Sequence, residues 1–335
     1  MVGSRARDAK TAAIALGVDV GATKVRAGLV SARGVVVRRA PARMLRRLAP
    51  PDVLRAVNEL VEPYLSDAAP RALAVGIAIA AQVDAPRGRV LYAPNLRWSN
   101  VALAEPLARR WGVPVVVEND VRASAYAEWR IGAGRGCPQM VLFWGGTGLG
   151  GGVVADGRLL RGTRGAAGEL GHLTVVTGGR KCSCPNRGCL EAYVGGWGIR
   201  ARAIDAIRRS PASGQRLVEA AGGIRRVNAR TVFEVAALGD PLASGIVRET
   251  REFLAAGAVT MVNAVNPSLV LLGGPIFSHW SGLPQFVQRA VRTRCQPPAA
   301  RGVRVRRARL GEWSPVVGAA LRAIEARAAP VRRST

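Results

Sequence analysis

The sequence predicts an α/β fold, because short apolar strands alternate with amphipathic helices and two glycine-rich turns join paired strands. The strands are expected at 14–20, 25–31, 35–39, 73–79, 113–117, 140–144, 153–155, 268–272 and 303–308. The helices are expected at 52–65, 103–111, 121–131, 198–209, 231–238, 241–265, 283–294 and 316–327, with a variable loop over 210–226. A chain of 335 residues can form two ordinary domains, and a glycine-rich turn in each half hints at a distant duplication.

The composition argues against several classes of protein. The formal charge is +27, but lysine occurs only at 10, 24 and 181, and arginine is spread along the whole chain. This pattern indicates a compositional bias towards arginine, so no specific nucleic-acid partner is expected. Five cysteines do not suggest a disulfide framework, and no signal peptide or membrane-spanning run is visible. We therefore expect a soluble cytoplasmic protein with no membrane partner.

The first glycine-rich turn lies between the first two predicted strands and reads DVGATK, residues 19–24. Gly21 would let backbone N–H groups approach a phosphate, and Thr23 and Lys24 add a hydroxyl and a positive charge. Asp19 could hold Mg²⁺ or a water bound to it. An ordinary hairpin turn remains an equal alternative from these residues alone.

Polar residues follow the strand predicted at 113–117, in the order Glu118-Asn119-Asp120. Side chains just past the end of a strand lie where α/β sheets bind their ligands. Asp120 is also the N-terminal neighbour of the helix predicted over 121–131, so it could instead cap that helix. Asp52 is expected to cap the helix over 52–65.

The second glycine-rich segment, 145–152, reads GGTGLGGG and is predicted to be neither helix nor ordinary strand. Strands on both sides indicate a hairpin whose backbone at Gly146, Thr147 and Gly148 contacts phosphate, although a flexible linker is an alternative. Gly273 and Gly274 follow a later strand and allow close approach to a nucleoside.

The stretch from Gly168 to Glu191 holds one histidine and three cysteines: His172, Cys182, Cys184 and Cys189. One histidine and three cysteines make a complete tetrahedral set for structural Zn²⁺, with no open position for chemistry. A cysteine-containing loop with an unrelated histidine is the alternative, since the C-x-C-x₄-C spacing departs from the commoner C-x₂-C. Glu169 and Glu191 bracket this group, and zinc would hold them in place.

Together these segments resemble the ROK family of repressors and sugar kinases, over about residues 13–327. DVGATK is similar to the family's first phosphate loop, VENDVRASAYAEW to its catalytic segment, and GGTGLGGGVVADGRLLRGTRGAAGELGH to its signature. KCSCPNRGCLE is similar to its zinc motif, and LLGGPI to its adenosine loop. The resemblance implies the actin-like, ribonuclease-H-like two-domain fold with a cleft between the domains. It also implies ATP-dependent phosphorylation of a hexose at the 6-hydroxyl, most often glucose.

Carried over by position, the resemblance makes Asp120 the general base that takes the proton of the sugar hydroxyl. A carboxylate suits that role, because phosphoryl transfer depends mainly on positioning and charge neutralisation. The residues that match sugar-binding positions are Asn95, Asn119, Asp120, Glu169, His172 and Glu191. His172 would bind zinc with one ring nitrogen and the sugar with the other. The implied cofactors are ATP with Mg²⁺ and structural Zn²⁺, and the implied assembly is a homodimer.

Three departures from the family pattern bear on these expectations. Ala22 stands where the first phosphate loop usually has a second glycine, which could crowd the turn. Ala80-Ala81 replaces a Pro-Gly beside the sugar, which puts the identity of the hexose in doubt. Gly145 replaces an aliphatic residue, with little effect expected.

The resemblance also leaves alternatives open. The enzyme could act on N-acetylglucosamine, N-acetylmannosamine, mannose or fructose, or use polyphosphate as donor. A sugar sensor or transcription regulator is less favoured, because the family's repressors carry an N-terminal helix-turn-helix and only about a dozen residues precede the first strand here. The expected domains are a small one over 13–118, with helix 315–328 packed back on it, and a large one over 119–314 that contains the zinc loop 172–189. The ends, 1–12 and 329–335, are expected to be disordered.

Overall fold

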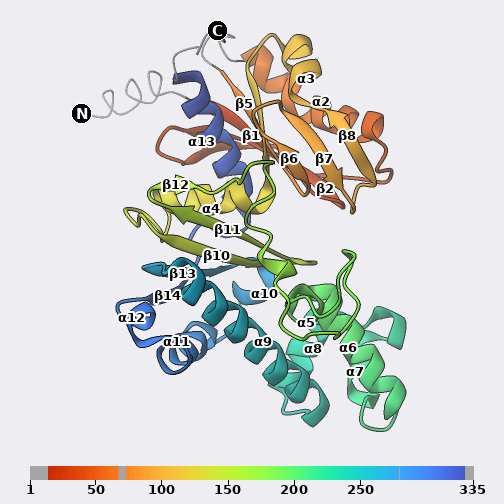
Figure 1. The fold of residues 1–335 in the computed structure, drawn as a ribbon. Helices are drawn as coiled ribbons and strands as arrows, with labels where there is room; N and C mark the ends of the chain where they lie inside the picture. The colour runs from red at the N-terminus through yellow and green to blue at the C-terminus, as the bar shows by residue number, and fades with distance from the viewer. Residues whose placement is uncertain (1–13, 68–72, 279, 329–335) are drawn as a thin grey trace, which may run out of the picture. The chain divides into compact units, whose positions relative to one another are not determined.

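The structure is a computed structural model that describes residues 14–67, 73–278 and 280–328 (Figure 1). The two ends expected to be disordered lie outside the described residues. Contacts between the described residues divide the chain into two compact units. The first contains 14–67, 73–135, 161–167 and 312–328, and the second contains 136–160, 168–278 and 280–311. Helix α4 (Asp120–Ile131) groups with the first unit, whereas the sequence assigned it to the second domain. The domain boundary predicted from the sequence, between residues 118 and 119, stays a prediction.

The first unit is built on a sheet with the strand order β3-β2-β1-β5-β9. Its strands are β1 (Ile14–Val20), β2 (Lys24–Ser31), β3 (Val36–Arg39), β5 (Val75–Ile79) and β9 (Val115–Asn119), and β4 (Arg43–Met44) pairs with β2. β1 is antiparallel to β2 and parallel to β5, and β5 is parallel to β9. The carboxyl ends of β1, β5 and β9 therefore meet at one edge of the sheet, where Val20 pairs with Ile79 and Ile79 with Asn119.

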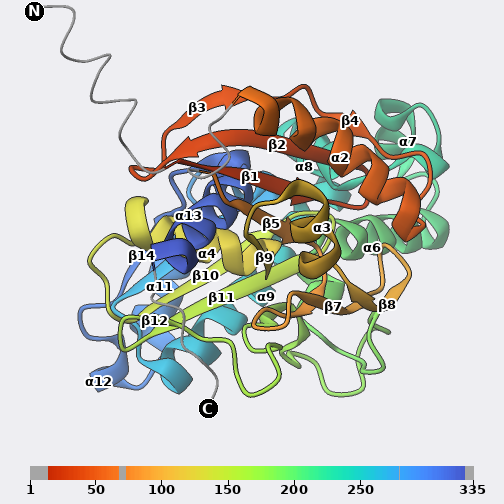
Figure 2. The same cartoon turned by 90° about the horizontal axis from the view of Figure 1, so that it is seen from above.

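Helices cover this sheet, as the top view in Figure 2 shows for α2 (Pro50–Asp67) and α13 (Ser314–Ala328). Leu16 and Val18 of β1 belong to one apolar core with Val53 and Val57 of α2. The intervening Gly17 faces α13 so closely that a Cβ there would lie 2.0 Å from a backbone oxygen of α13. The alternation of side chains along β1 thus gives each helix its own face of the sheet.

The expectation that Asp52 caps α2 is wrong, because the helix begins two residues earlier than expected. The helix begins at Pro50, and Asp52 lies within its first turn, with its backbone N–H donating to Ala49 O at 3.1 Å. Proline at the start of a helix needs no hydrogen-bond partner, which moves the start ahead of the aspartate. Asp52 still places a negative charge near the positive end of the helix.

A second sheet in the first unit was not predicted. It contains β6 (Gln82–Asp84), β7 (Arg89–Ala93) and β8 (Trp98–Ala102), in that order. These strands are short and β6 pairs with β7 through an irregular register, so no period-2 pattern is long enough to be recognised. The exposed Asn95 lies in the turn between β7 and β8. Helix α3 (Ala104–Trp111) follows β8 and packs against β9.

The second unit repeats the strand order of the first: β12-β11-β10-β13-β14. The strands are β10 (Met140–Gly145), β11 (Leu149–Ala155), β12 (Arg158–Leu159), β13 (Leu269–Gly273) and β14 (Arg304–Arg307). As in the first unit, a central hairpin is followed by two strands parallel to its first strand. The shared order supports the duplication that the paired glycine-rich turns suggested.

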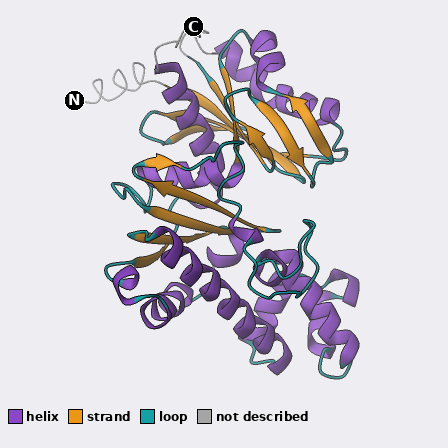
Figure 3. Cartoon of the chain, in the orientation of Figure 1, coloured by secondary structure: helices purple, strands orange, loops and turns teal. Residues whose placement is uncertain are grey.

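The long connection from β12 to β13 is largely helical after the cysteine-rich loop (Figure 3). Its helices are α5 (Glu191–Val194), α6 (Gly196–Arg209), α7 (Gln215–Ala221), α8 (Ala229–Ala237) and α9 (Pro241–Val265). After β13 come α10 (Pro275–Ser278), α11 (Leu283–Arg294) and α12 (Pro297–Ala300). The loop expected over 210–226 contains α7, which places Leu217 in the core formed with α6 and α8.

The expectation that 145–152 forms no ordinary strand is wrong for most of the segment. β10 continues to Gly145 and β11 begins at Leu149, so only residues 146–148 form the turn. Gly151 pairs with Phe143 in the ladder, and a Cβ there would lie 2.2 Å from Leu170 Cγ. The strand glycines thus make room for the next segment of the chain instead of interrupting the strand.

Candidate active site

The predicted phosphate turn and Asp120 lie at one edge of the first sheet, where β1, β5 and β9 end. The turn after β1 is closed by Gly21 N–H, which donates to Lys24 O at 3.1 Å. No residue from 21 to 24 has a positive φ, and Ala22 packs partly buried against the core. An alanine is therefore accommodated in this turn without crowding it.

Asp19, at the end of β1, is buried and forms an ion pair with Arg26 Nη2 at 2.7 Å. Burial raises the pKa of Asp19 despite the favourable charge of Arg26. Arg26 Nη1 also pairs with Glu312 at 2.9 Å. We did not predict Arg26 from the sequence, although the hairpin register pairs it directly with Asp19. Within the described chain, Oδ1 of Asp19 accepts no hydrogen bond, so it can take a cation or a water bound to one.

Asp120 is the first residue of α4, and the cap of that helix is Asn119. The Asn119 Oδ1 accepts from Arg122 N–H at 2.9 Å, while its Nδ2 donates to Ala81 O and to Asp120 Oδ1, both at 3.1 Å. The Asp120 Oδ1 also accepts from Val121 N–H at 2.9 Å. The capping role considered for Asp120 thus belongs to its neighbour, which in turn orients the Asp120 carboxylate near the positive end of the helix.

Glu118, the residue before Asn119, lies at the centre of a buried ion-pair network. Its carboxylate receives Arg122 Nε at 2.9 Å and Arg161 Nη2 at 2.7 Å, and its side chain is 3% exposed. Burial opposes ionisation, but the two guanidinium groups outweigh it and hold the pKa of Glu118 below its usual value.

The same network reaches the loop that leads to Glu169. Arg122 Nη1 donates to Gly165 O, and to Ala167 O at 3.3 Å. The segment 161–167 is therefore tied to the first turn of α4, which begins at Asp120. Neither Arg122 nor Arg161 was expected to support the site, because no local pattern in the sequence places them beside Glu118.

In the second unit, Glu191 joins three segments of the chain. Its Oε2 accepts from Leu149 N–H at 2.9 Å, at the end of the glycine-rich turn. Its Oε1 accepts from Ser183 Oγ at 3.1 Å, in the cysteine-rich loop, and from Trp197 Nε1 at 3.0 Å. A Cβ on Gly148 would lie 2.4 Å from Glu191 Oε2, so glycine in the turn is what allows this approach. Ser183 and Trp197 were not predicted from the sequence.

The turn at residues 146–148 also contacts the start of α6 and lies close to Gly274. Trp197 N–H donates to Thr147 O at 2.9 Å. Gly274 follows β13 with φ 89°, and a Cβ there would lie 2.4 Å from Gly145 O. The two glycine loops assigned to phosphate and nucleoside are thus neighbours in this unit. Gly145 in turn leaves room for the ring of Phe277, which a Cβ would approach to 2.8 Å, and this explains the missing aliphatic side chain.

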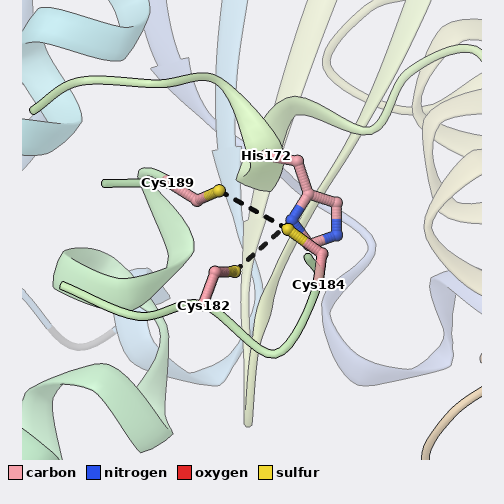
Figure 4. Close-up of side chains that lie close together, drawn as sticks. All are labelled: His172, Cys182, Cys184 and Cys189. Atoms are coloured by element: carbon pink, nitrogen blue, oxygen red, sulfur yellow. Dashed lines mark hydrogen bonds between the residues drawn. The ribbon is translucent and has the colours of Figure 1, made fainter. Parts of the chain in front are cut away.

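The four predicted zinc ligands come together in one cluster (Figure 4). Their ligand atoms all lie within 4.8 Å of one another, with Cys182 Sγ 3.7 Å from His172 Nδ1 and Cys184 Sγ 3.6 Å from Cys189 Sγ. A tetrahedral zinc site with Zn–S bonds of about 2.3 Å needs sulfur atoms about 3.8 Å apart. The spacing and the donor set therefore fit Zn²⁺.

The two nitrogens of His172 face different partners. Nδ1 faces the sulfur atoms, whereas Nε2 lies 4.0 Å from Glu169 Oε2. Burial raises the pKa values of the Cys182 and Cys189 thiols, that of Cys189 to about 12, so a cation is needed to hold them as thiolates at neutral pH. A metal on Nδ1 would fix the imidazole ring and with it the direction of Nε2.

The two units of like topology, each with its glycine loops, are what the predicted actin-like fold class requires. The actin-like fold class is confirmed by solved structures of the same fold, among them a ROK family glucokinase from Streptomyces griseus in complex with glucose and AMPPNP. That structure has a TM-score of 0.78, is 31% identical, and is covered over 99% of its length by 93% of this chain. No helix in the described part of the chain has the length and apolar character needed to cross a bilayer.

The chain belongs to the ROK family, which it matches over residues 15–326. A glucokinase of Thermotoga maritima is 35% identical over 263 residues, which cover 78% of this chain and 81% of the relative. The transcriptional regulator NagC of Escherichia coli is 28% identical over 224 residues, which cover 67% of this chain and 53% of the regulator. The family predicted from the sequence motifs is thereby confirmed.

Proposed function

We propose that this protein is an ATP-dependent hexose kinase that phosphorylates the 6-hydroxyl of the sugar, with glucose as the preferred substrate. The support from relatives is the name glucokinase, which the Thermotoga and Streptomyces coelicolor relatives carry at 35% and 31% identity. The observation that carries the proposal is the placement of Asp120. Its carboxylate is held by Asn119 and by the backbone of α4 at the sheet edge where the first phosphate turn also begins.

In the proposed reaction, Asp120 accepts the proton of the 6-hydroxyl as the hydroxyl oxygen attacks the γ-phosphorus of ATP. The bond from that phosphorus to the β,γ-bridging oxygen breaks at the same time, and ADP leaves. Orientation and charge neutralisation supply most of the catalysis in phosphoryl transfer, and a held carboxylate meets the need for a base. Mg²⁺ bound to ATP would neutralise charge on the transferred phosphoryl group. Asp19, through its free Oδ1, would hold that ion or a water on it, and the backbone around Gly21, Thr23 and Lys24 would face the phosphates.

The second unit would contribute the remaining phosphate and nucleoside contacts and most of the sugar contacts. We assign the phosphates to Gly146, Thr147 and Gly148 and the nucleoside to Gly273 and Gly274. Glu169 would accept hydrogen bonds from sugar hydroxyls, and His172 Nε2 would donate one to a sugar hydroxyl. Glu191 already receives three hydrogen bonds, so in this proposal it contacts the sugar with its remaining lone pairs and also holds the loops together.

The first unit would add Asn95 and Asn119 to the sugar contacts. Asn119 uses both amide hydrogens on Ala81 and Asp120, so its sugar contact would be as an acceptor. The Ala81 carbonyl is in this way part of the support of Asp120. Zinc in the Cys/His cluster would be structural, because its four protein ligands leave no open position.

The test is ADP release across a panel of hexoses, with ATP and polyphosphate as donors. We expect turnover with glucose and ATP, and a loss of about 10²-fold or more in kcat for Asp120→Asn with glucose binding retained. Near-normal turnover by Asp120→Asn would reject the assignment of the base. Sugar binding without ADP release by the wild type would reject the kinase in favour of a sensor.

A further inference from the structure

An open, solvent-accessible cavity of about 550 Å³ in the second unit is not used by the proposed reaction. It lies between the cysteine-rich loop and the first turns of α6. The loop contributes Arg180, Lys181 and Arg187, and α6 contributes Trp197 and Ala201. None of the described residues that line it is acidic. A volume of this size lies within the usual range for small-molecule sites, which is about 300–1,000 Å³.

Two of the three cations in the cavity face each other without a counter-charge. Lys181 and Arg187 form an antiparallel bridge, so their side chains leave the same face of the loop. Within the described chain neither one pairs with a carboxylate, whereas Arg180 pairs with Asp205 at 2.5 Å. Like charges directly opposite each other are destabilising, and a bound anion would relieve this repulsion.

The loop that carries these cations has a fixed shape. Gly188 N–H donates to Arg180 O at 2.7 Å, and Arg180 N–H donates to the Tyr193 hydroxyl at 2.9 Å. A Cβ on Gly188 would lie 1.6 Å from Val176 O, so the loop passes there in a way that only glycine permits. The same loop holds the zinc ligands Cys182, Cys184 and Cys189. The backbone that carries the cations is therefore preorganised, which lowers the entropic cost of binding a ligand.

The cavity combines charge with an aromatic wall. The half-buried Trp197 lines the cavity, and an indole ring packs well against the apolar face of a sugar or another flat ring. A phosphate group carries a charge of about −1.5 to −2 at neutral pH and offers three acceptor oxygens. We propose that this cavity binds a phosphorylated sugar, with the phosphate on Lys181 and Arg187 and the ring on Trp197.

The cavity shares Trp197 with the proposed sugar site, because the same indole donates to Glu191 and the Trp197 backbone donates to Thr147 O. A ligand that moves the indole changes the support of Glu191. The bound sugar phosphate therefore alters the affinity for the sugar substrate. This second step rests on the proposed function, while the binding step does not.

Isothermal titration calorimetry of zinc-loaded protein in saturating glucose tests the binding step. Glucose 6-phosphate, inorganic phosphate and tripolyphosphate are the probes. Lys181→Ala with Arg187→Ala is expected to weaken glucose 6-phosphate binding by about tenfold or more, since two charge-assisted contacts are lost. The matched control is Arg289→Ala with Arg292→Ala, which removes two exposed arginines from α11 and is expected to change the affinity by less than about twofold.

Equal affinity in the two double variants, or no binding by the wild type, would overturn the proposal. Inorganic phosphate or tripolyphosphate binding as tightly as glucose 6-phosphate would show that charge alone is recognised and would overturn the ring contact. Zinc content checks the loop in each variant. If the double alanine variant loses zinc, the single variant Lys181→Gln is used instead, provided that it keeps its zinc. Weaker binding of glucose 6-phosphate by Lys181→Gln is then expected, and unchanged binding would overturn the proposal.

The coupling step is measured separately, as the rise in the glucose KM with increasing glucose 6-phosphate. Competition by product raises the KM equally in the wild type and in the Lys181→Ala/Arg187→Ala variant. A difference between the two is expected if the cavity acts through Trp197. If glucose 6-phosphate binds in calorimetry but raises the glucose KM equally in the two proteins, the coupling is rejected and the binding site is retained. Absence of any turnover would reject the proposed function alone.

Discussion

The two units have the same strand order, but they fix their functional loops by different means. In the first unit, ion pairs and amide hydrogen bonds hold the residues at the sheet edge: Arg26 on Asp19, Arg122 and Arg161 on Glu118, and Asn119 on Asp120. In the second unit, close packing at glycines and a Cys/His cluster hold them. A shared topology therefore positions the loops, while the chemistry that stabilises them is independent in each unit.

The largest expected effect comes from removing a ligand of the Cys/His cluster. Cys184→Ser should abolish tight zinc binding and lower the free energy of unfolding of the second unit by about 4 kcal/mol, because metal binding and loop folding are linked. Glucose affinity should fall with it, since His172 and Ser183 lie in the same loop. Metal content, calorimetry with glucose and thermal unfolding measure the three effects.

Cys295→Ser is the control for that variant, because Cys295 is a buried cysteine outside the cluster and its replacement keeps the metal. Loss of zinc with unchanged glucose affinity would break the link between the cluster and the sugar contacts. The second unit would then owe its loop geometry to glycine packing alone.

The corresponding test in the first unit is Glu118→Gln. Removing the charge between Arg122 and Arg161 leaves a buried guanidinium without its partner and should cost about 3 kcal/mol. Glu105→Gln, in an exposed pair with Arg109, is the control and should cost less than about 0.5 kcal/mol. Equal losses in urea unfolding of the two variants would contradict the importance of the buried network.

The same network predicts a pH dependence. The pKa of folded Glu118 is lower than its ordinary value of 4.5, so its ion pairs contribute stability that is fully present above that pH. The contribution is lost as the pH falls below 4.5 towards the folded pKa. Wild-type unfolding measured from neutral pH to pH 3 should therefore show a steeper decline than Glu118→Gln over the acid range, and parallel curves would contradict the assignment.

Replacing a glycine by alanine should have a smaller effect on stability, and this effect should differ between the two glycine-rich hairpins. A Cβ at Gly151 would meet Leu170 Cγ at 2.2 Å, so Gly151→Ala should overpack the second unit by about 2 kcal/mol. A Cβ at Gly21 would lie 3.4 Å from its nearest neighbour, Lys24 O, so Gly21→Ala should change stability by less than about 0.5 kcal/mol. Chemical unfolding of both variants checks the contrast, which disappears if the two losses are equal.

The smallest expected effect concerns one hydrogen bond. Trp197→Phe keeps an aromatic ring but removes the donor to Glu191 Oε1, which leaves the donors from Ser183 and Leu149. The glucose KM should rise by about fivefold with kcat nearly unchanged, the cost of one hydrogen bond to a charged group that keeps other partners. Trp129→Phe in the first unit is the control. A fall in kcat with unchanged KM would show that Trp197 serves the phosphate turn and not the sugar contacts.

The sequence was sufficient where the pattern is local. The helices at Pro241–Val265 and Leu283–Arg294 were predicted with their observed ends, because proline marks each start and the apolar spacing continues to the last turn. The four members of the Cys/His cluster were recognised from residue type and density alone, and the family followed from motifs that are contiguous in the chain.

Other features depended on contacts between residues distant in the sequence. The short strands of the second sheet exist through pairing with one another, and Gly151 lies in a strand at a point where Leu170 packs against it. The partners of Glu118 and Glu191 come from positions up to 43 residues away, so no local pattern could identify Arg161 or Leu149.

The sequence by itself therefore determined the fold class, the family, the members of the Cys/His cluster and the order of the glycine turns. Local chemistry and periodicity encode these properties directly. Only the tertiary structure decided that Asn119 and not Asp120 caps α4, that Glu191 links three loops, and that Lys181 and Arg187 face each other over a cavity. Side-chain partners are set by how strands and loops pack, and the physical cause of that packing is spread over the whole chain.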